Sequence, residues 1–133
     1  MLVRLKVSTM GSGKQLVFLH GWVVNSGVWQ PLINMLKNEF CITTIDLPGY
    51  GCNHQQLPTP YNLQNIAQTV AEHLPANCIL IGWSLGGLVA QKIAYIYPEK
   101  LQQLVLICSS PKFAKGADWP GIDHNVLVFF LSN

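Results

Sequence analysis

Apolar and polar residues follow regular periods along most of the 133-residue chain. Near the N-terminus, Leu2–Val7 alternates apolar and basic side chains, which predicts a half-exposed edge strand. Four later runs are either continuously apolar or rich in Ile and Thr, as expected of strands inside a sheet. They predict strands at Gln15–His20, Cys41–Asp46, Asn77–Trp83 and Gln103–Cys108.

Stretches with helical spacing separate these predicted strands. Over residues 63–74 the apolar positions recur every three or four residues, which predicts an amphipathic helix with Asn62 as its N-cap. Two more helices are expected at about 28–38 and 85–97, whereas the prolines and glycines of residues 47–60 predict a loop. This alternation predicts an α/β fold, in which helices cover both faces of a parallel sheet.

One short motif lies between a predicted strand and a predicted helix, Gly82-Trp83-Ser84-Leu85-Gly86. A serine flanked by glycines in this position is typical of a nucleophile elbow, a sharp turn that exposes the hydroxyl above the sheet. Such a turn brings the residues two before and two after the serine together, so both are glycine. The sequence therefore predicts Ser84 as the nucleophile of an acyl-transfer enzyme. An ordinary glycine-rich turn is the alternative.

A nucleophilic serine needs two backbone N–H groups that stabilise the oxyanion of the tetrahedral intermediate. One is expected from Leu85, directly after the nucleophile. The other is expected from Trp22, just after the predicted strand that ends at His20. The side chain of Trp22 would then form a wall of the acyl pocket.

His20 and Asp46 are candidates for the general base and the acid of a catalytic triad. Because the base follows the serine along the chain in this type of site, we expect His20 to bond loop backbone instead. Asp46 ends a predicted strand, and we expect it to hold the following loop by hydrogen bonds, with a triad acid as the alternative. His54 and His73 are expected to face solvent.

Composition narrows the functional classes. Hydrophobic residues make up 50% of the chain and charged residues 11%, and the +2 charge includes no basic run, so nucleic-acid binding is not expected. We expect no cofactor, no signal peptide and no membrane span, since the apolar runs are too short. The cysteines form no CxxC pair, so we expect no metal site and interpret them as buried free thiols of a cytoplasmic protein: Cys41, Cys52, Cys78 and Cys108.

Several motifs together resemble a known family. The sequences HGW at 20–22, DLPGYG at 46–51 and GWSLGGLVA at 82–90 resemble the α/β-hydrolase superfamily. Further motifs make the chain most similar to the pimeloyl-[acyl-carrier protein] methyl ester esterase family of biotin biosynthesis: Asn25, Val28-Trp29, Ser109-Ser110-Pro111 and Trp119-Pro120-Gly121-Ile122. The resemblance implies hydrolysis of the methyl ester of a pimeloyl group on acyl carrier protein. It also implies Ser84 as nucleophile, and Trp22, Ser84 and Leu85 as substrate-binding residues.

The resemblance also bears on domain organisation. We expect residues 1–117 to be the N-terminal part of the hydrolase core and 118–133 to begin the cap region, truncated before the cap and the last strands. The family's catalytic Asp and His lie beyond the cap, and the adjacent Asp123 and His124 cannot replace them in a relay. The apolar run Val126–Leu131 favours a truncated or frame-disrupted product, inactive by itself. Without the last strands, Gln103–Cys108 is expected to be left as an exposed apolar edge. Another esterase or thioesterase of this fold and a non-catalytic remnant are the alternatives.

Overall fold

Five strands form one sheet in the computed structural model, which describes residues 3–127. The strands are β1 (Val7–Met10), β2 (Lys14–Leu19), β3 (Phe40–Ile45), β4 (Cys78–Trp83) and β5 (Leu101–Ile107). They lie in the order β1-β3-β2-β4-β5, with β1 antiparallel to β3 and all the other neighbours parallel. The predicted parallel sheet is confirmed, with an antiparallel strand added at one edge.

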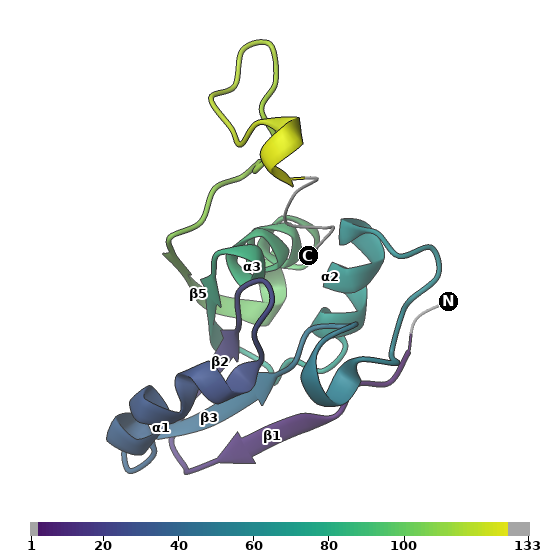
Figure 1. Ribbon diagram of the computed structural model, residues 1–133. Coiled ribbons are helices and arrows are strands. Elements are labelled where there is room, and N and C mark those ends of the chain that lie inside the picture. The colour runs from purple at the N-terminus through teal and green to yellow at the C-terminus, as the bar shows by residue number, and fades with distance from the viewer. Residues whose placement is uncertain (1–2, 128–133) are drawn as a thin grey trace.

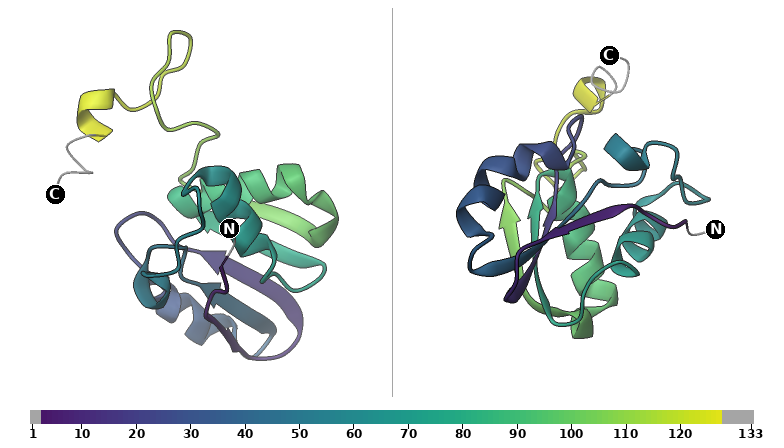
Figure 2. Two further views of the ribbon diagram at one scale, coloured as in Figure 1. Left: turned by 90° about the vertical axis from the view of Figure 1, so that its right-hand side faces the viewer. Right: turned by 90° about the horizontal axis from the view of Figure 1, so that it is seen from below.

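Helices cover both faces of this sheet, as predicted (Figure 1). Helix α1 (Gln30–Leu36) lies on one face, and α2 (Leu63–Ala71) and α3 (Leu85–Ile96) lie on the other, as Figure 2 shows. Asn62 caps α2 as predicted, because its side-chain oxygen accepts a hydrogen bond of 2.9 Å from the Asn65 N–H. Short 3-10 turns complete the elements: η1 (Ser26–Trp29), η2 (Gly51–Asn53) and η3 (Pro98–Lys100).

The alternation of side chains along β2 divides the core into two layers. Val17 and Leu19 pack in a cluster with residues of α2 and α3, whereas Leu16 and Phe18 pack with Trp29 and other residues on the α1 side. Successive side chains of a strand point to opposite faces, so an apolar strand needs a cover on each face. This burial holds the carboxyl ends of the parallel strands in place at one edge.

The prediction of an edge strand at Leu2–Val7 is wrong in its position. Strand β1 begins only at Val7, and Leu2 lies outside the described residues. Side chains satisfy the preceding backbone instead: the Leu5 N–H donates to His73 Nε2 at 3.0 Å, and the Lys6 N–H donates to Asn53 Oδ1 at 2.8 Å. Backbone groups that already have these partners do not need a strand partner.

The run Gln103–Cys108, which has the pattern of a buried strand, forms the exposed apolar edge that is predicted when the last strands are absent. Strand β5 spans Leu101–Ile107, and its apolar side chains at 104–107 are 36–41% exposed. They are exposed because within residues 3–127 only β4 pairs with β5. A sequence pattern reports that a strand is apolar on both faces, but not which neighbours cover it.

Residues 108–127 form an arm that leaves the end of β5 and projects away from the sheet (Figure 1). The arm folds back on itself, because Ala114 pairs with Ile122 and the Trp119 indole N–H donates to the Lys112 carbonyl at 2.8 Å. The predicted boundary between 117 and 118 falls inside this arm and stays a prediction. Most of the run Val126–Leu131 lies outside the described residues.

Candidate active site

Ser84 lies on the turn between β4 and α3, as the motif predicts. Its backbone has φ 52° and ψ −113°, in the left-handed region that a residue with a side chain rarely occupies. Two hydrogen bonds hold the turn: the Ser84 N–H donates to the Ile107 carbonyl, and the Ser109 hydroxyl donates to the Ser84 carbonyl, both at 2.9 Å. The half-buried Ser84 side chain is thereby presented at the end of the strand.

The glycines around Ser84 allow close backbone approach. A Cβ atom on Gly82 would lie 2.5 Å from the Gly86 carbonyl oxygen, which confirms the predicted collision across the turn. A Cβ on Gly86 would collide with a different partner, the backbone carbonyls of Leu19 and His20 at the end of β2. The turn is therefore pressed against the neighbouring strand as well as against itself, which the motif alone does not indicate.

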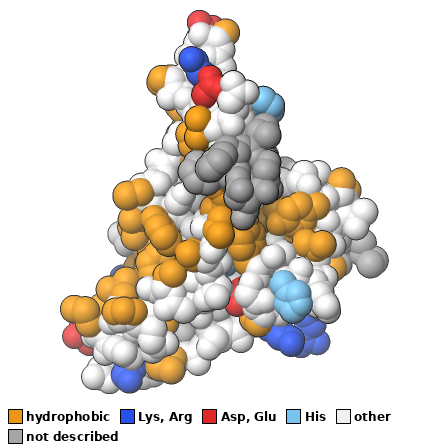
Figure 3. All heavy atoms as spheres, in the orientation of Figure 1, with side chains coloured by type: hydrophobic (Ala, Val, Ile, Leu, Met, Phe, Trp, Pro, Cys, Tyr) orange, Lys and Arg blue, Asp and Glu red, His pale blue; other side chains and the backbone are white. Residues whose placement is uncertain are grey.

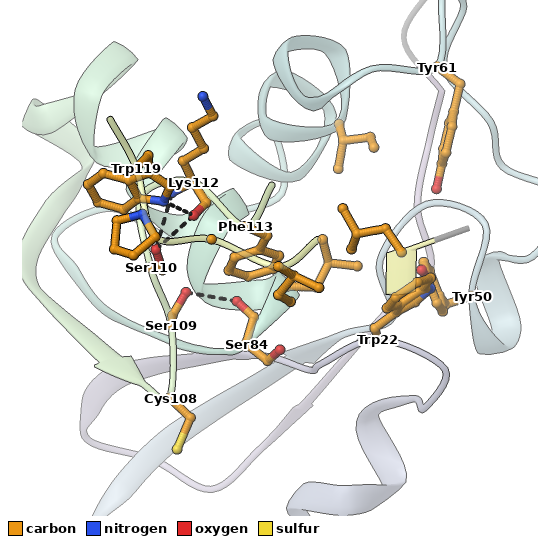
Figure 4. A pocket seen from close by; sticks show the side chains of 16 residues that line it. Trp22, Tyr50, Tyr61, Ser84, Cys108, Ser109, Ser110, Lys112, Phe113 and Trp119 are labelled. Atoms are coloured by element: carbon orange, nitrogen blue, oxygen red, sulfur yellow. Dashed lines mark hydrogen bonds between the residues drawn. The ribbon is translucent and has the colours of Figure 1, made fainter. Parts of the chain in front are cut away.

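A cavity of about 900 Å³ opens above Ser84 (Figure 4). Its walls come from the segments that follow the carboxyl ends of the parallel strands, together with α2 and the arm. This is the edge at which open α/β sheets bind ligands. Of the residues in these walls, only Trp22, Ser84 and Leu85 are predicted site residues. The sequence assigns no place at the site to the others, which include Tyr50, Tyr61, Ile66, Cys108 and Phe113.

Both residues predicted to form the oxyanion hole lie at this cavity. Trp22 follows β2 and Leu85 follows Ser84, and each lines the same space as the serine. Leu85 begins α3, and the first N–H groups of a helix have no carbonyl partner within it. The geometry brings together the three predicted residues; their roles in catalysis stay a prediction.

His20 is fully buried and has a structural role, as predicted. Its Nδ1 bonds the Gly21 carbonyl at 2.7 Å, and its Nε2 accepts the Leu47 N–H at 2.9 Å, which assigns the proton to Nδ1. Burial lowers the pKa of His20, against smaller upward effects of the Gly21 carbonyl and of Asp46. With both ring nitrogens occupied, His20 is not a base for Ser84.

Asp46 also has the predicted structural role. Its carboxylate accepts the Ser26 N–H at 2.7 Å and the Cys52 N–H at 2.9 Å, so it joins the loops that follow β2 and β3. Burial alone would raise the pKa of Asp46, but the hydrogen bonds from Cys52 and Ser26 outweigh burial and hold it below its usual range. The carboxylate is therefore ionised and committed to the loops.

The other histidines do not reach the cavity. His54 is exposed as predicted, whereas the prediction for His73 is wrong, because its ring is half-buried and bonds the Leu5 N–H and the Thr69 carbonyl. His124 is exposed on the arm. Of the residues lining the cavity in the described part of the chain, none is a histidine or a carboxylate, and Lys112 is the one charged side chain.

The cysteines only partly follow the prediction of buried thiols. All four are free, and Cys78 is buried, but Cys52 and Cys108 are exposed and Cys41 is partly exposed. Cys108 is exposed because it directly follows the edge strand β5 and lines the cavity. Within residues 3–127 no group of three or more His, Cys, Asp or Glu side chains could hold a metal ion. The helices of this same range are all too short or too polar to cross a membrane.

Comparison with other sequences identifies similar proteins. The chain is 56% identical to the pimeloyl-[acyl-carrier protein] methyl ester esterase of Pseudoalteromonas atlantica over 126 residues, covering 95% of this chain and 49% of the relative. The protein of the same name from Wigglesworthia glossinidia brevipalpis is 46% identical, with 91% and 46% covered. The chain thus spans about half the length of these relatives.

Solved structures agree with the sequence comparison. An esterase from Exiguobacterium antarcticum superposes with a TM-score of 0.85 at 26% identity, covering 96% of this chain and 50% of the esterase. A hydrolase from Oleispira antarctica, at 22% identity and a TM-score of 0.84, shares the fold. The profile of the alpha/beta hydrolase fold family matches residues 14–131, and the chain belongs to that family.

Proposed function

We propose that this chain carries the nucleophile half of a carboxylic ester hydrolase, with Ser84 as the attacking residue. The observation that carries the proposal is the strained turn that presents the Ser84 side chain to an apolar cavity. Strained backbone of this kind concentrates at functional sites. The chain also belongs to the alpha/beta hydrolase fold family, and an esterase is among the solved structures similar to it.

In the proposed reaction, Ser84 Oγ attacks the ester carbonyl carbon while a base takes the hydroxyl proton. The N–H groups of Leu85 and Trp22 stabilise the oxyanion. The bond to the alkoxy group then breaks, and the alcohol leaves with the proton. Water hydrolyses the acyl-enzyme, which releases the acid and restores the Ser84 hydroxyl.

The base in this reaction comes from elsewhere. Since no histidine or carboxylate of the described residues lines the cavity, we assign the base to a segment corresponding to the other half of the longer relatives. The chain as it stands should then lack Ser84-dependent turnover, because an unassisted serine hydroxyl is a weak nucleophile.

The proposed substrate is the methyl ester of pimeloyl-acyl carrier protein, with acyl carrier protein as partner in biotin biosynthesis. The names of the relatives and the extent of the match support it. A cytoplasmic location is part of the proposal, because four unpaired cysteines suit a reducing compartment. A general carboxylesterase is the second candidate, favoured by the likeness to the Exiguobacterium antarcticum esterase.

The test joins this chain to the second half of the Pseudoalteromonas atlantica relative and measures hydrolysis of a short activated ester. Ser84→Ala in the chimera should lower the rate by several orders of magnitude, as loss of a triad member does. Ser12→Ala, at an exposed turn far from the cavity, is the matched control and should keep the rate. A Ser84→Ala chimera with more than a tenth of the activity would refute the nucleophile.

The substrate is tested separately with the same chimera. The ratio of kcat/KM for the methyl ester of pimeloyl-acyl carrier protein to that for a simple methyl ester should strongly favour the carrier-bound substrate. Equal values would favour a general carboxylesterase. A folded chimera without any ester hydrolysis would favour the non-catalytic remnant.

A further inference from the structure

A second, smaller cavity adjoins the one above Ser84. It has a volume of about 250 Å³ and lies between the loop that follows β3 and the N-terminal turns of α2 and α3. Its walls are almost entirely apolar and include Leu47, Pro48, Leu63, Leu88 and Val89.

Four residues line both cavities and form the boundary between them: Tyr50, Tyr61, Ile66 and Leu85. The tyrosines are held in place, since the Tyr61 hydroxyl donates to the Pro48 carbonyl at 2.8 Å and the Tyr50 ring packs edge-on against His20 at 5.3 Å. Ile66 and Leu85 are half-buried aliphatic side chains, and Leu85 directly follows Ser84. The two cavities therefore meet at this aliphatic pair and the two aromatic rings.

Two of the polar groups at this second cavity already have hydrogen-bond partners. The Asn62 side-chain oxygen caps α2, and the Tyr61 hydroxyl is bonded to Pro48. None of its described lining residues is charged. Ligand sites are typically concave and lined mostly by apolar side chains. An apolar recess of this size beside a candidate nucleophile therefore favours an apolar ligand.

We propose that the second cavity binds the uncharged alkyl chain of an ester whose carbonyl lies at Ser84. An apolar cavity of about 150 Å³ takes up benzene, so one of about 250 Å³ accommodates a chain of roughly eight to ten carbons. A charged chain end would lose its hydration there without gaining an oppositely charged partner, and a polar end would face mostly apolar walls. The inference rests on the proposed function in taking Ser84 as the reacting group, and adds medium-length aliphatic esters as a substrate class.

The test reads binding rather than turnover, on the 133-residue chain with labelled methyl groups. Titration with 1-octanol should shift the NMR signals of Leu63, Leu88 and Val89 in a saturable way. Octane-1,8-diol has the same length but would bury a second hydroxyl, so it should bind about tenfold more weakly. Equal affinity for the two alcohols, or shifts confined to residues of the larger cavity, would overturn the proposal.

Variants locate the site and separate this inference from the proposed function. Leu88→Trp would fill the cavity and should weaken 1-octanol binding by about tenfold or more, through lost burial of several methylenes. Met35→Trp, on the 76% exposed side chain of α1, adds the same ring elsewhere and should leave the affinity unchanged. Ser84→Ala should also bind 1-octanol with the wild-type affinity. Saturable binding of 1-octanol at Leu88, together with a chimera that hydrolyses no ester, would uphold this inference and reject the proposed function. Ester hydrolysis by the chimera without binding of 1-octanol at Leu88 would uphold the proposed function and reject this inference.

Discussion

The backbone at Ser84 is held in a conformation that costs about 1–3 kcal/mol, with φ at 52°. This conformation persists because the neighbouring backbone holds the turn on both sides. The Ser84 N–H and carbonyl are both bonded to residues at or just after β5, and the glycines on either side pack against backbone. At the residue scale, the position of the hydroxyl is therefore determined by backbone contacts.

Gly86→Ala tests the close approach of the turn to β2. The added Cβ would meet the carbonyl groups of Leu19 and His20, which are backbone atoms that cannot rotate away. We expect a loss of about 1–3 kcal/mol in the free energy of unfolding, measured by urea denaturation.

Gly116→Ala is the matched control for this change. The nearest atom to its added Cβ is Lys112 Nζ at 2.9 Å, the mobile end of a long side chain. Stability should change by no more than a few tenths of a kcal/mol. Equal effects of the two substitutions would show that Gly86 is not pressed against β2.

At the scale of elements, buried and half-buried polar side chains hold the loops at the carboxyl ends of the strands. Asp46 joins the turn at Ser26 to η2, and His20 joins the end of β2 to Leu47. Asn53, fully buried, bonds the carbonyls of Asp46 and Lys6 through its side-chain amide. These contacts connect the walls of the cavity to the sheet, so their loss should affect stability and site geometry together.

The lowered pKa of His20 predicts acid sensitivity. A histidine in the unfolded chain has a pKa of 6.5, whereas the folded state holds the His20 ring neutral, because a second ring proton would face the Leu47 N–H. Below pH 6.5 the unfolded state binds the proton more readily, so stability should fall as pH drops from 6.5 toward the folded pKa. The pKa of Asp46 lies below the 3.8 of an ordinary aspartate, so this residue adds a further loss only in more acidic solution.

Unfolding measured between about pH 7.5 and 5, the range around the ordinary pKa of histidine, checks this prediction. His20→Gln removes the titrating ring and should reduce the slope of stability against pH. His54→Gln, at an exposed ring, is the matched control and should keep the wild-type slope. An unchanged slope in His20→Gln would contradict the assignment of this acid sensitivity to His20.

For the molecule as a whole, the exposed edge strand β5 is expected to govern association with other copies of the chain. Its side chains at 104–107 are 36–41% exposed, and in the described part of the chain the strand has a neighbour on one side only. Hydrophobic side chains also gather on the face of the molecule beneath the arm (Figure 3). Exposed apolar strand edges pair readily with other chains.

We therefore expect the 133-residue chain to self-associate through β5. Val105→Lys places a charge on this strand and should shift the sedimentation coefficient toward that of the monomer. Ser8→Lys places the same charge on β1, the four-residue strand at the opposite edge, and should leave association unchanged. Identical behaviour of both variants and the wild type would exclude β5 as the contact.

Much of the fold could be predicted from local patterns. The runs that became β2, β3 and β4 were predicted to within one residue at each end, and Asn62 was predicted as the cap of α2. The failures involve distant partners. The first strand was misplaced because Asn53 and His73 bond the N-terminal backbone, and these side chains are 47 and 68 residues away from their partners.

The sequence by itself determined the α/β alternation and the turn at Ser84, because both depend on residues within a few positions of one another. Only the tertiary structure decided the strand order and the walls of the two cavities. Those walls combine the segments after β2, β3 and β4 with α2, α3 and the arm, and no local period links such segments. The physical reason is that apolar burial is non-directional, so a pattern shows that a side chain is covered but not by what.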